Sequence, residues 1–517
     1  MSDTSNPGRS GRDDDDQDDD YDPGALPDVF GTREDFGDFA EMGDDDERDH
    51  DDRDDEKLAS EDAARDAASA AADASAASRV FDELLERVGE VSPQPRLGAT
   101  RRAVELLGDP HHAAPVIHIT GTNGKTSTSR IIESILRAYG LRTGLMTSPH
   151  LVKVNERIVI DGRPISDGSL AANWSDIQPF LAIVDTELAA AAEEPLTYFE
   201  ALTVLAFASF ADAPVDVVVL EVGMGGEWDS TNAADGQVAV FTPIALDHTK
   251  RLGSTVEEIA RTKSGIIKPL ANVVTAAQLP EALAELRRAA ELTESTIVVE
   301  GQGFGITASA VAVGGQLISV QGIAAKYDDL ALPLFGRHQA QNAAVAIAAV
   351  ESFLGNGSQP LDPDILAEGL GAVSSPGRLQ IVANDPIILV DAAHNPHGAT
   401  SLAKALTEYF SFDRIVAVLA VLDDKDAAGI VRALAPTVEQ FVITQSDSDR
   451  AIEADDLAAI AVGIVGPDRV VVESNVVTAL GAARDLAEEA ERGGVIVTGS
   501  ITLVGDVLAL TEQGDWK

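Results

Sequence analysis

Six consecutive residues have the types and the order that bind phosphate: Gly121, Thr122, Asn123, Gly124, Lys125 and Thr126. The two glycines can adopt positive φ, and the amides of the loop and of the following helix then point at an anion. The lysine adds a mobile charge for β- and γ-phosphates, and the last hydroxyl can reach Mg²⁺. Ile119 replaces the first glycine of the full P-loop pattern, so this is a shorter variant. We expect a nucleotide phosphate site; a turn that merely joins a strand to a helix is the alternative.

A second group of polar residues follows apolar runs of the chain. Ser148 directly follows one such run, Glu221 closes the run VDVVVLE, and Asp247 and His248 come soon after a third. In open α/β sheets the ligand site lies off the carboxyl ends of the strands, so we expect these residues beside the loop. A hydroxyl, a carboxylate and an imidazole there are a reasonable set of ligands for Mg²⁺ that bridges phosphates. Because Mg²⁺ prefers oxygen, His248 could instead cap a helix or support the other ligands.

Two further candidates lie later in the chain. Lys263 is in a helical turn before an apolar Gly-Ile-Ile, and taken alone it would be a solvated lysine. Asp391 and His394 lie in DAAHNP, directly after the apolar run IILV, so both emerge at a strand end. Asp391 could bind ribose hydroxyls and His394 a substrate carboxylate if a cleft separates two domains. An Asx-type turn is the alternative for this motif.

The order of apolar runs predicts how these residues are positioned. Continuous branched runs separated by helical stretches indicate a mostly parallel sheet covered on both sides. The following segments are expected as strands of such sheets: 116–120, 141–147, 215–221, 238–242, 387–391, 415–419, 441–444, 470–473 and 495–498. Helices are expected at 80–88, 97–107, 199–210 and 336–353, and a glycine-spaced antiparallel patch at 298–332. The fold class is therefore α/β, with a P-loop-type, mostly parallel sheet domain and a smaller Rossmann-like domain.

Length and charge set the domain organisation. At 517 residues the chain is too long for one ordinary core. Residues 1–60 hold 24 Asp and Glu against 6 Lys and Arg, so we expect a disordered acidic tail over 1–78. A metal-binding or nucleic-acid-mimicking tail is the alternative. The sheet domain is expected over 79–374 and the Rossmann-like domain over 375–517.

Composition also excludes several classes. There is no cysteine, so disulfides and thiolate metal sites are excluded. We find neither an apolar run of spanning length nor a signal-peptide pattern, so we expect a cytoplasmic protein without a membrane partner. Of the net charge of −48, residues 1–60 carry −18, and the remaining −30 argues against nucleic-acid binding because phosphates would be repelled.

Over residues 80–517 the chain resembles the Mur ligase superfamily, and within it the folylpolyglutamate synthase / dihydrofolate synthase family. The resemblance is carried by ten motifs in the order in which that family has them. They are GTNGKTS, TSPHLVKVNERI, TYFEALT, EVGMGGEWDSTN, PIALDHTKRLG, KSGI, GRHQAQNAAVA, PGRL, DAAHNP and TGS. Three positions depart from the family's common pattern: Thr126, Glu227 and Ser230.

The resemblance implies roles by position. It implies that Gly121–Thr126 hold the phosphates of ATP, that Asn342, Arg378 and Asp391 contact adenine, phosphate and ribose, and that Ser148, Glu221 and His248 ligate Mg²⁺. Lys263 matches a lysine that the family carbamylates for a second Mg²⁺, and Lys125 would act in catalysis. The pterin pocket would comprise Thr147, Thr197, Phe199, Trp228, Asp229 and Ser230. His394 and Ser500 would receive glutamate.

The implied reaction is ATP-dependent amide formation. A carboxylate of dihydropteroate or a folate is phosphorylated, and the amine of L-glutamate displaces the phosphate. A Mur peptide ligase that acts on another carboxylate, a non-ligase NTPase and a non-catalytic binding protein are the alternatives. For a Mur peptide ligase we would expect a sugar-nucleotide domain, and too little chain precedes the P-loop for it. A non-ligase NTPase would not need the DAAHNP motif. A non-catalytic binding protein would have lost the loop lysine. We expect a monomer.

Overall fold

The computed structural model describes residues 48–89 and 94–513. The chain divides into two units, residues 1–65 and 66–517. Helix α1 (Arg48–Leu85) begins in the first unit and ends in the second. The sequence predicted a helix only over 80–88 and a disordered tail as far as residue 78. Helix α1 extends back from that predicted helix over residues 48–78 of the expected tail, and the later part of this segment has an alanine-rich, helix-favouring composition. The rest of the expected tail, residues 1–47, lies outside the described residues.

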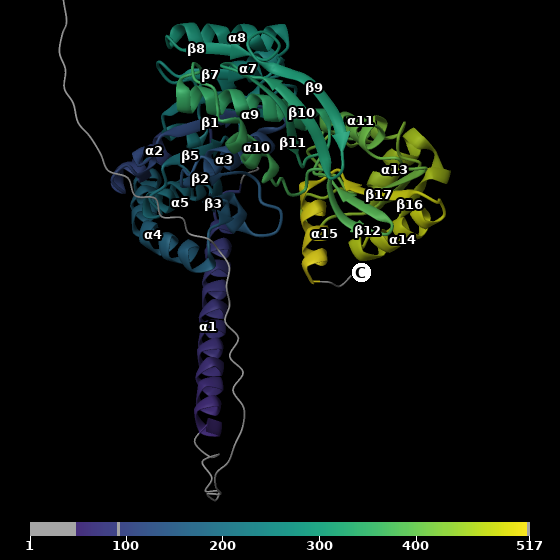
Figure 1. Ribbon diagram of the computed structural model, residues 1–517, viewed down its shortest axis with the longest axis horizontal. Helices are drawn as coiled ribbons and strands as arrows, with labels where there is room; N and C mark the ends of the chain where they lie inside the picture. The colour runs from purple at the N-terminus through teal and green to yellow at the C-terminus, as the bar shows by residue number, and fades with distance from the viewer. Residues whose placement is uncertain (1–47, 90–93, 514–517) are drawn as a thin grey trace, which may run out of the picture. The chain divides into compact units, whose positions relative to one another are not determined.

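The largest sheet of the second unit has eight strands in the order β4-β3-β2-β5-β1-β6-β7-β8 (Figure 1). The strands from β2 to β8 in this order are parallel, and β3 and β4 add an antiparallel edge. Their bounds are β1 (Val116–Thr120), β2 (Thr143–Met146), β3 (Ile158–Ile160), β4 (Arg163–Pro164), β5 (Val217–Glu221), β6 (Gly236–Phe241), β7 (Asn272–Thr275) and β8 (Thr296–Val299). The sequence prediction of a mostly parallel sheet is confirmed.

Helices cover this sheet on both faces, because its strands are apolar throughout. Ile117 and Ile119 of β1 are fully buried beneath apolar residues of α3 and α9, whereas Val116 packs with the core that α5 helps to form. The helices are α2 (Gly98–Leu106), α3 (Lys125–Ala138), α4 (Asp167–Ala190), α5 (Tyr198–Asp212), α6 (Thr249–Leu252), α7 (Val256–Ser264), α8 (Pro280–Leu292), α9 (Arg337–Gly355) and α10 (Pro363–Gly371). Short 3₁₀ turns are η1 (Pro110–His112), η2 (Val154–Arg157) and η3 (Ser230–Ala233).

A separate antiparallel sheet has the order β11-β10-β9. Its strands are β9 (Gly305–Ala312), β10 (Gly315–Gln321) and β11 (Lys326–Leu332). They fill the antiparallel patch that glycine spacing predicted at 298–332. We call residues 98–371, with both of these sheets, the first lobe.

The second lobe, residues 380–513, is built on a six-stranded sheet of order β12-β13-β17-β14-β15-β16. Its strands are β12 (Gln380–Asn384), β13 (Ile387–Val390), β14 (Arg414–Leu419), β15 (Gln440–Ile443), β16 (Val470–Val472) and β17 (Gly493–Thr498). Its helices are α11 (Pro396–Tyr409), α12 (Ala427–Leu434), α13 (Ala454–Val465), α14 (Val476–Glu488) and α15 (Ile501–Gln513), with a 3₁₀ turn η4 (Pro467–Arg469). Only the edge strand β12 is antiparallel. The boundary expected at 374/375 falls between α10 and β12.

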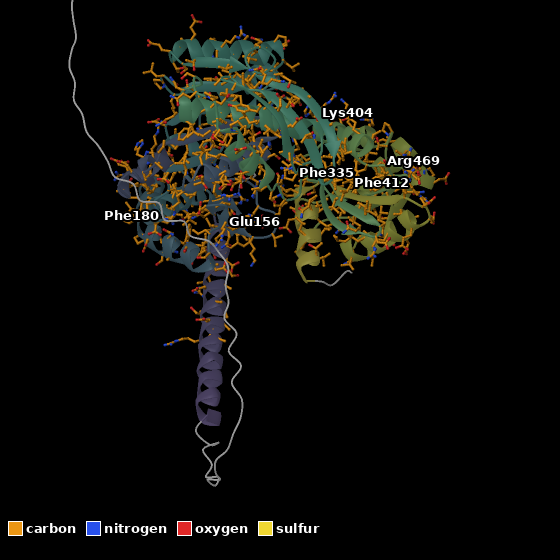
Figure 2. All side chains as sticks on the ribbon, viewed as in Figure 1. Glu156, Phe180, Phe335, Lys404, Phe412 and Arg469 are labelled. Atoms are coloured by element: carbon orange, nitrogen blue, oxygen red, sulfur yellow. The ribbon has the colours of Figure 1, made fainter. Side chains whose placement is uncertain are left out.

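Some side chains of the first lobe belong to the core of the second. Leu151 and Val152 pack against the apolar cluster beneath α15, and Phe335 packs against the cluster beneath α11. The Phe335 ring lies 5.0 Å from that of Phe410, next to Phe412 (Figure 2). None of the described helices is both long enough and apolar enough to cross a membrane.

Candidate functional site

The phosphate loop leaves the central strand of the large sheet. In the ladder Ile119 pairs with Glu221 of β5, and Thr120 pairs with Phe241 of β6. The residues that follow these parallel strands therefore emerge at one edge, as expected. The loop approaches its neighbours closely: a Cβ at Gly121 would overlap Thr242 Oγ1, and one at Gly124 would lie 2.6 Å from Asn342 Oδ1. The glycines are thus required by contacts as well as by positive φ.

We expect Gly124→Ala to weaken nucleotide binding. Its φ of +88° disfavours any side chain, and the added carbon would push Asn342 of α9 out of place. The strain should cost about 1–3 kcal/mol, which is a loss of roughly 5- to 150-fold in ATP affinity if it falls on the bound loop. Titration calorimetry with a non-hydrolysable ATP analogue would measure it. Gly108→Ala, at a positive-φ glycine with open space around it, is the matched control. Equal ATP affinity in both variants would contradict the prediction.

Lys125 and Thr126 begin helix α3 beside the buried carboxylate of Glu221. Lys125 Nζ lies 3.3 Å from each of the carbonyl oxygens of Gly121 and Thr122. The Thr126 hydroxyl donates to Glu221 Oε1 at 3.0 Å. Burial raises the pKa of Glu221, while the charge of Lys125 and the Thr126 hydrogen bond oppose the rise. Lysine, hydroxyl and carboxylate thus occupy the place where a nucleotide's terminal phosphate is expected.

The residues expected to hold Mg²⁺ lie around this carboxylate. Glu221 is 1% exposed, yet its second oxygen, Oε2, has no hydrogen-bond partner. The amide of Ser148 also lowers the pKa of Glu221, so Ser148 is adjacent to it. Burial lowers the pKa of His248 to about 4, which leaves a neutral imidazole at pH 7. No group of three or more His, Asp or Glu side chains within residues 48–89 and 94–513 is arranged as a metal site. An unpartnered buried carboxylate oxygen nevertheless suits Mg²⁺.

Lys263, in the last turn of α7, points into the same site. Its Nζ donates to the Gly121 carbonyl at 2.8 Å, and its side chain is 4% exposed. Burial and the nearby charge of Lys125 together lower the pKa of Lys263 to about 7, against the opposing influence of Asp247 and Asp229. The alternative of a solvated lysine is therefore wrong.

The two lobes meet at the loop. Asn123 Oδ1 accepts from Asn395 Nδ2 at 3.1 Å, and Asn123 Nδ2 lies 2.9 Å from His397 Nδ1. A half-buried ion pair joins Asp247 of the first lobe to Lys425 of the second at 3.6 Å. Burial acts to raise the pKa of Asp247, but electrostatic interactions with His248 and Lys425 outweigh burial and lower the pKa. The interlobe contact is thus polar and lies directly at the phosphate loop.

The residues expected at adenine and ribose are found on both lobes. Asn342 on α9 touches the loop at Gly124, as described above. Arg378 lies within electrostatic reach of both Glu221 and Asp391. The Asp391 oxygens accept from the amides of Leu379 and Ala393, each at 2.9 Å, and burial raises the pKa of Asp391. The Asx-type turn is therefore present, and ribose binding by Asp391 stays a prediction.

His394 and Ser500 both follow strands of the second sheet. His394 Nδ1 lies 2.9 Å from the Ala392 carbonyl, so it carries the proton and Nε2 is left as an acceptor. Burial lowers the pKa of His394 to about 4, helped by Lys425. Ser500 is fully buried and hydrogen-bonds Thr502 at 2.6 Å. The described contacts therefore do not join Ser500 to His394.

The expected pterin residues fall into two groups. Thr197 caps α5 in a reciprocal pair with Glu200, and Thr147 hydrogen-bonds the backbone of Arg157, whose guanidinium lies over the Tyr198 ring. The second group surrounds the glycine loop 223–226. Phe199 lies against Gly223 and Trp228 against Gly225, while buried Asp229 accepts from the Met224 amide and burial raises its pKa. Ser230 begins η3 and is buried.

Sequence reasoning missed three residues at this site: Lys425, Asn395 and Arg130. Asn395 lies inside DAAHNP and Lys425 follows strand β14, so the strand-end rule could have found both. Arg130 gave a weaker signal, a charged residue among small and apolar residues of α3.

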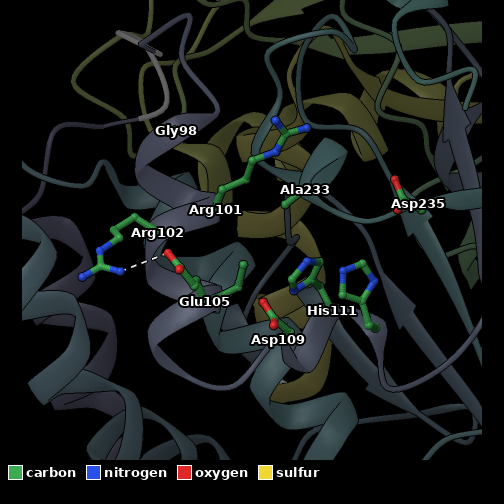
Figure 3. Close-up of a pocket in the computed structure, with 10 residues that line it drawn as sticks. Gly98, Arg101, Arg102, Glu105, Asp109, His111, Ala233 and Asp235 are labelled. Atoms are coloured by element: carbon green, nitrogen blue, oxygen red, sulfur yellow. Dashed lines mark hydrogen bonds and ion pairs between the residues drawn. The ribbon is translucent and has the colours of Figure 1, made fainter.

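An open pocket also lies away from this site. It is bounded by α2, η1 and the end of η3, and Arg101, Glu105, His111 and Asp235 are among its lining residues (Figure 3). None of the predicted site residues lines it.

Comparison with known protein families shows the class of enzyme to which the chain belongs. Residues 119–350 match the Mur ligase middle domain, and residues 377–501 match the Mur ligase glutamate ligase domain. The chain is thus an ATP-dependent ligase that combines a middle domain with a glutamate ligase domain.

Relatives then narrow the class. The chain is 41% identical over 441 residues to the dihydrofolate synthase/folylpolyglutamate synthase of Mycobacterium tuberculosis, covering 81% of this chain and 91% of the relative. The Bacillus subtilis protein of the same description is 35% identical over 366 residues, covering 70% and 84%. A solved M. tuberculosis folylpolyglutamate synthase complexed with ADP and AMPPCP has a TM-score of 0.81 at 40% identity, covering 85% of this chain and 99% of that one. The chain belongs to the dihydrofolate synthase/folylpolyglutamate synthase family.

Proposed function

We propose that the protein joins L-glutamate to dihydropteroate, to a reduced folate, or to both, with ATP as the source of energy. The observation that carries the proposal is the contact of the phosphate loop with the glutamate ligase lobe through Asn123 and Asn395. Through this contact, the terminal phosphate of a nucleotide on the loop would lie next to the second lobe, where the amine of glutamate would bind. An Escherichia coli relative has been solved with DHPP and ADP, at a TM-score of 0.73 and 29% identity.

The reaction has two steps. An oxygen of the substrate carboxylate attacks the γ-phosphorus of ATP, and the bond to the bridging oxygen breaks to release ADP. The glutamate nitrogen then attacks the carbonyl carbon of the acyl phosphate, loses its proton, and phosphate leaves. Lys125 and the loop amides would stabilise the charge that develops on the phosphoryl oxygens, as in other phosphoryl transfers. The second lobe would exclude water, which would otherwise hydrolyse the acyl phosphate.

Glu221, Ser148 and neutral His248 are the residues that would hold Mg²⁺. The ion would supply positive charge that screens the transferring phosphoryl group. Glu221 suits this role because burial leaves one of its oxygens without a partner.

The second lobe would supply the remaining contacts. Arg378 and Asp391 would hold nucleotide phosphate and ribose, with Asn342 of the first lobe at the adenine. His394 and Ser500 would receive glutamate. The pterin would lie among Thr147, Thr197, Phe199 and the segment from Trp228 to Ser230.

Lys263 is proposed to carry a carbamate that serves a second Mg²⁺. Carbon dioxide reacts only with a neutral amine, and burial brings the pKa of Lys263 to about 7. We therefore expect carbamylation to increase as the pH rises from about 6 to 8. Carbon-13 NMR of the protein in labelled bicarbonate would detect it, with Lys263→Met as a negative control and exposed Lys404→Met as the matched control. A carbamate signal that persists in Lys263→Met would refute the assignment.

The proposed function is tested by ADP release from the purified protein with Mg²⁺, ATP and glutamate. Dihydropteroate or tetrahydrofolate is added in separate assays, and stimulation by either one is expected. Stimulation by both would make the enzyme bifunctional. ATP binding without stimulation by either would favour another Mur-type ligase, and hydrolysis independent of both would favour a simple NTPase. A monomeric, cytoplasmic protein without nucleic-acid partners also stays a prediction.

A further inference from the structure

Arg130 is a half-buried arginine without a partner, one turn along α3 from Thr126. Its Nε is fully shielded from solvent and has no hydrogen-bond partner. Within the described part of the chain, the guanidinium forms no hydrogen bond or ion pair with any residue. Burial lowers the pKa of Arg130, since the charged form has lost water without gaining a direct partner. A guanidinium in this condition is a ready site for an anion.

The carboxylates near Arg130 are engaged elsewhere. Arg130 interacts electrostatically with Glu221, Glu156 and Glu133, and these interactions act to raise its pKa. Glu156 (Figure 2) uses both oxygens to accept the amides of residues 151–153, at 2.7–2.8 Å. Glu133 accepts from Arg137 and Thr143 through Oε1, and Glu221 accepts from Thr126 through Oε1. None of the three forms a hydrogen bond or an ion pair with Arg130, and Glu221 Oε2 is itself without a hydrogen-bond partner.

The surroundings of Arg130 indicate which anion it would meet. Thr126 and Arg130 are four residues apart on α3, so they lie on one face of the helix. Thr126 contacts Glu221, at the phosphate end of the site. Glu156 accepts hydrogen bonds from residues 151–153, in the segment that follows Ser148 and the expected pterin residue Thr147. Arg130 thus lies between the end where the phosphoryl group is transferred and the segment that leads to the pterin residues.

We propose that Arg130 binds the carboxylate of the pteroate or folate substrate, the group that becomes phosphorylated. The inference rests on the proposed function. ATP phosphates already have Lys125, the loop amides and the N-terminus of α3. A planar carboxylate matches the two parallel N–H groups of a guanidinium and would complete its hydrogen bonding. Arg130 would hold and orient the carboxylate through these two hydrogen bonds, and a remaining lone pair on one of its oxygens would attack the γ-phosphorus.

The test compares Arg130→Met and Arg130→Lys with Arg137→Met. Arg137 is two turns further along the same helix and is paired with Glu133, so it is the matched control. We expect Arg130→Met to raise KM for tetrahydrofolate or dihydropteroate about 10- to 100-fold, the range for a lost hydrogen-bonded charge. KM for ATP and for glutamate should stay within about threefold of the wild type, below the effect of one hydrogen bond. Arg130→Lys should recover part of the loss, and Arg137→Met should match the wild type.

Two outcomes would overturn the proposal. Unchanged KM for the pteroate or folate substrate in a folded, active Arg130→Met enzyme is one. A rise in the Mg²⁺ and ATP requirements without a change for that substrate is the other, because Arg130 would then only position Glu221. Equilibrium binding of tetrahydrofolate, followed by intrinsic tryptophan fluorescence, tests the contact without turnover, and circular dichroism checks folding. A wild-type enzyme that no folate stimulates would refute the proposed function instead.

Discussion

Lys125→Ala is expected to lower kcat for ADP release by at least about 1000-fold, the scale found when charge on a transferred phosphoryl group is no longer stabilised. The lysine Nζ rests on the carbonyls of Gly121 and Thr122, within the loop and beside Glu221. Since these contacts are with backbone oxygens at the surface of the site, their loss should leave the fold intact. The measurement is steady-state ADP release with saturating glutamate and tetrahydrofolate or dihydropteroate.

Two controls accompany this variant. Lys404→Ala, at an exposed lysine of α11, should retain the wild-type rate. Thermal melting should give Lys125→Ala a midpoint close to that of the wild type. A folded Lys125→Ala enzyme with a near-native rate would refute the assignment of the loop.

Glu221→Gln should also lower kcat, by about 100- to 1000-fold, since one preorganised charge would be lost from the site. The two effects of this substitution have opposite signs. Because burial raises the pKa of Glu221, its ionised form destabilises the folded protein at pH values above the ordinary carboxyl pKa. A neutral glutamine removes this destabilisation. We therefore expect an unchanged or higher melting temperature without ligand. The increase in melting temperature that Mg²⁺ and an ATP analogue confer on the wild type should be lost.

The decisive comparison is with Glu200→Gln, another buried carboxylate, which pairs with Arg96 and caps α5. That variant should lose stability and keep the ligand-induced increase. If Glu221→Gln kept both its rate and its response to Mg²⁺, the metal assignment would be wrong.

Much of the phosphate end of the site could be predicted from the sequence, because the signals there are local. Apolar runs identified the strands, and parallel strands place the residues that follow them at one edge. The loop, Glu221 and Ser148 were therefore expected together, and the structure brings them together. The direct hydrogen bond of Thr126 to Glu221 follows from adjacent strands β1 and β5.

The rest of the site depends on contacts between distant parts of the chain. Nothing in the sequence pairs Asp247 with Lys425 or Asn123 with Asn395, because each pair joins different sheets. The low pKa of Lys263 has the same origin, since burial beneath the loop is a tertiary effect. Helix α1 was underestimated for another reason: its acidic, alanine-rich start lacks the apolar periodicity that marks a packed helix.

Because Leu151 and Val152 pack into the core of the second lobe, the two lobes are not independent folding units. The Leu151 carbonyl lies so close to Gly505 of α15 that even a methyl group there would overlap it. If the gene were divided at codon 374, Leu151, Val152 and Phe335 would be on the first polypeptide. The second lobe, whose core they complete, would then lack them. The separated second half would expose the apolar surface that they cover, and such surface promotes aggregation. Recombination between relatives should therefore succeed only when residues 148–156 are inherited together with the carboxyl-terminal half.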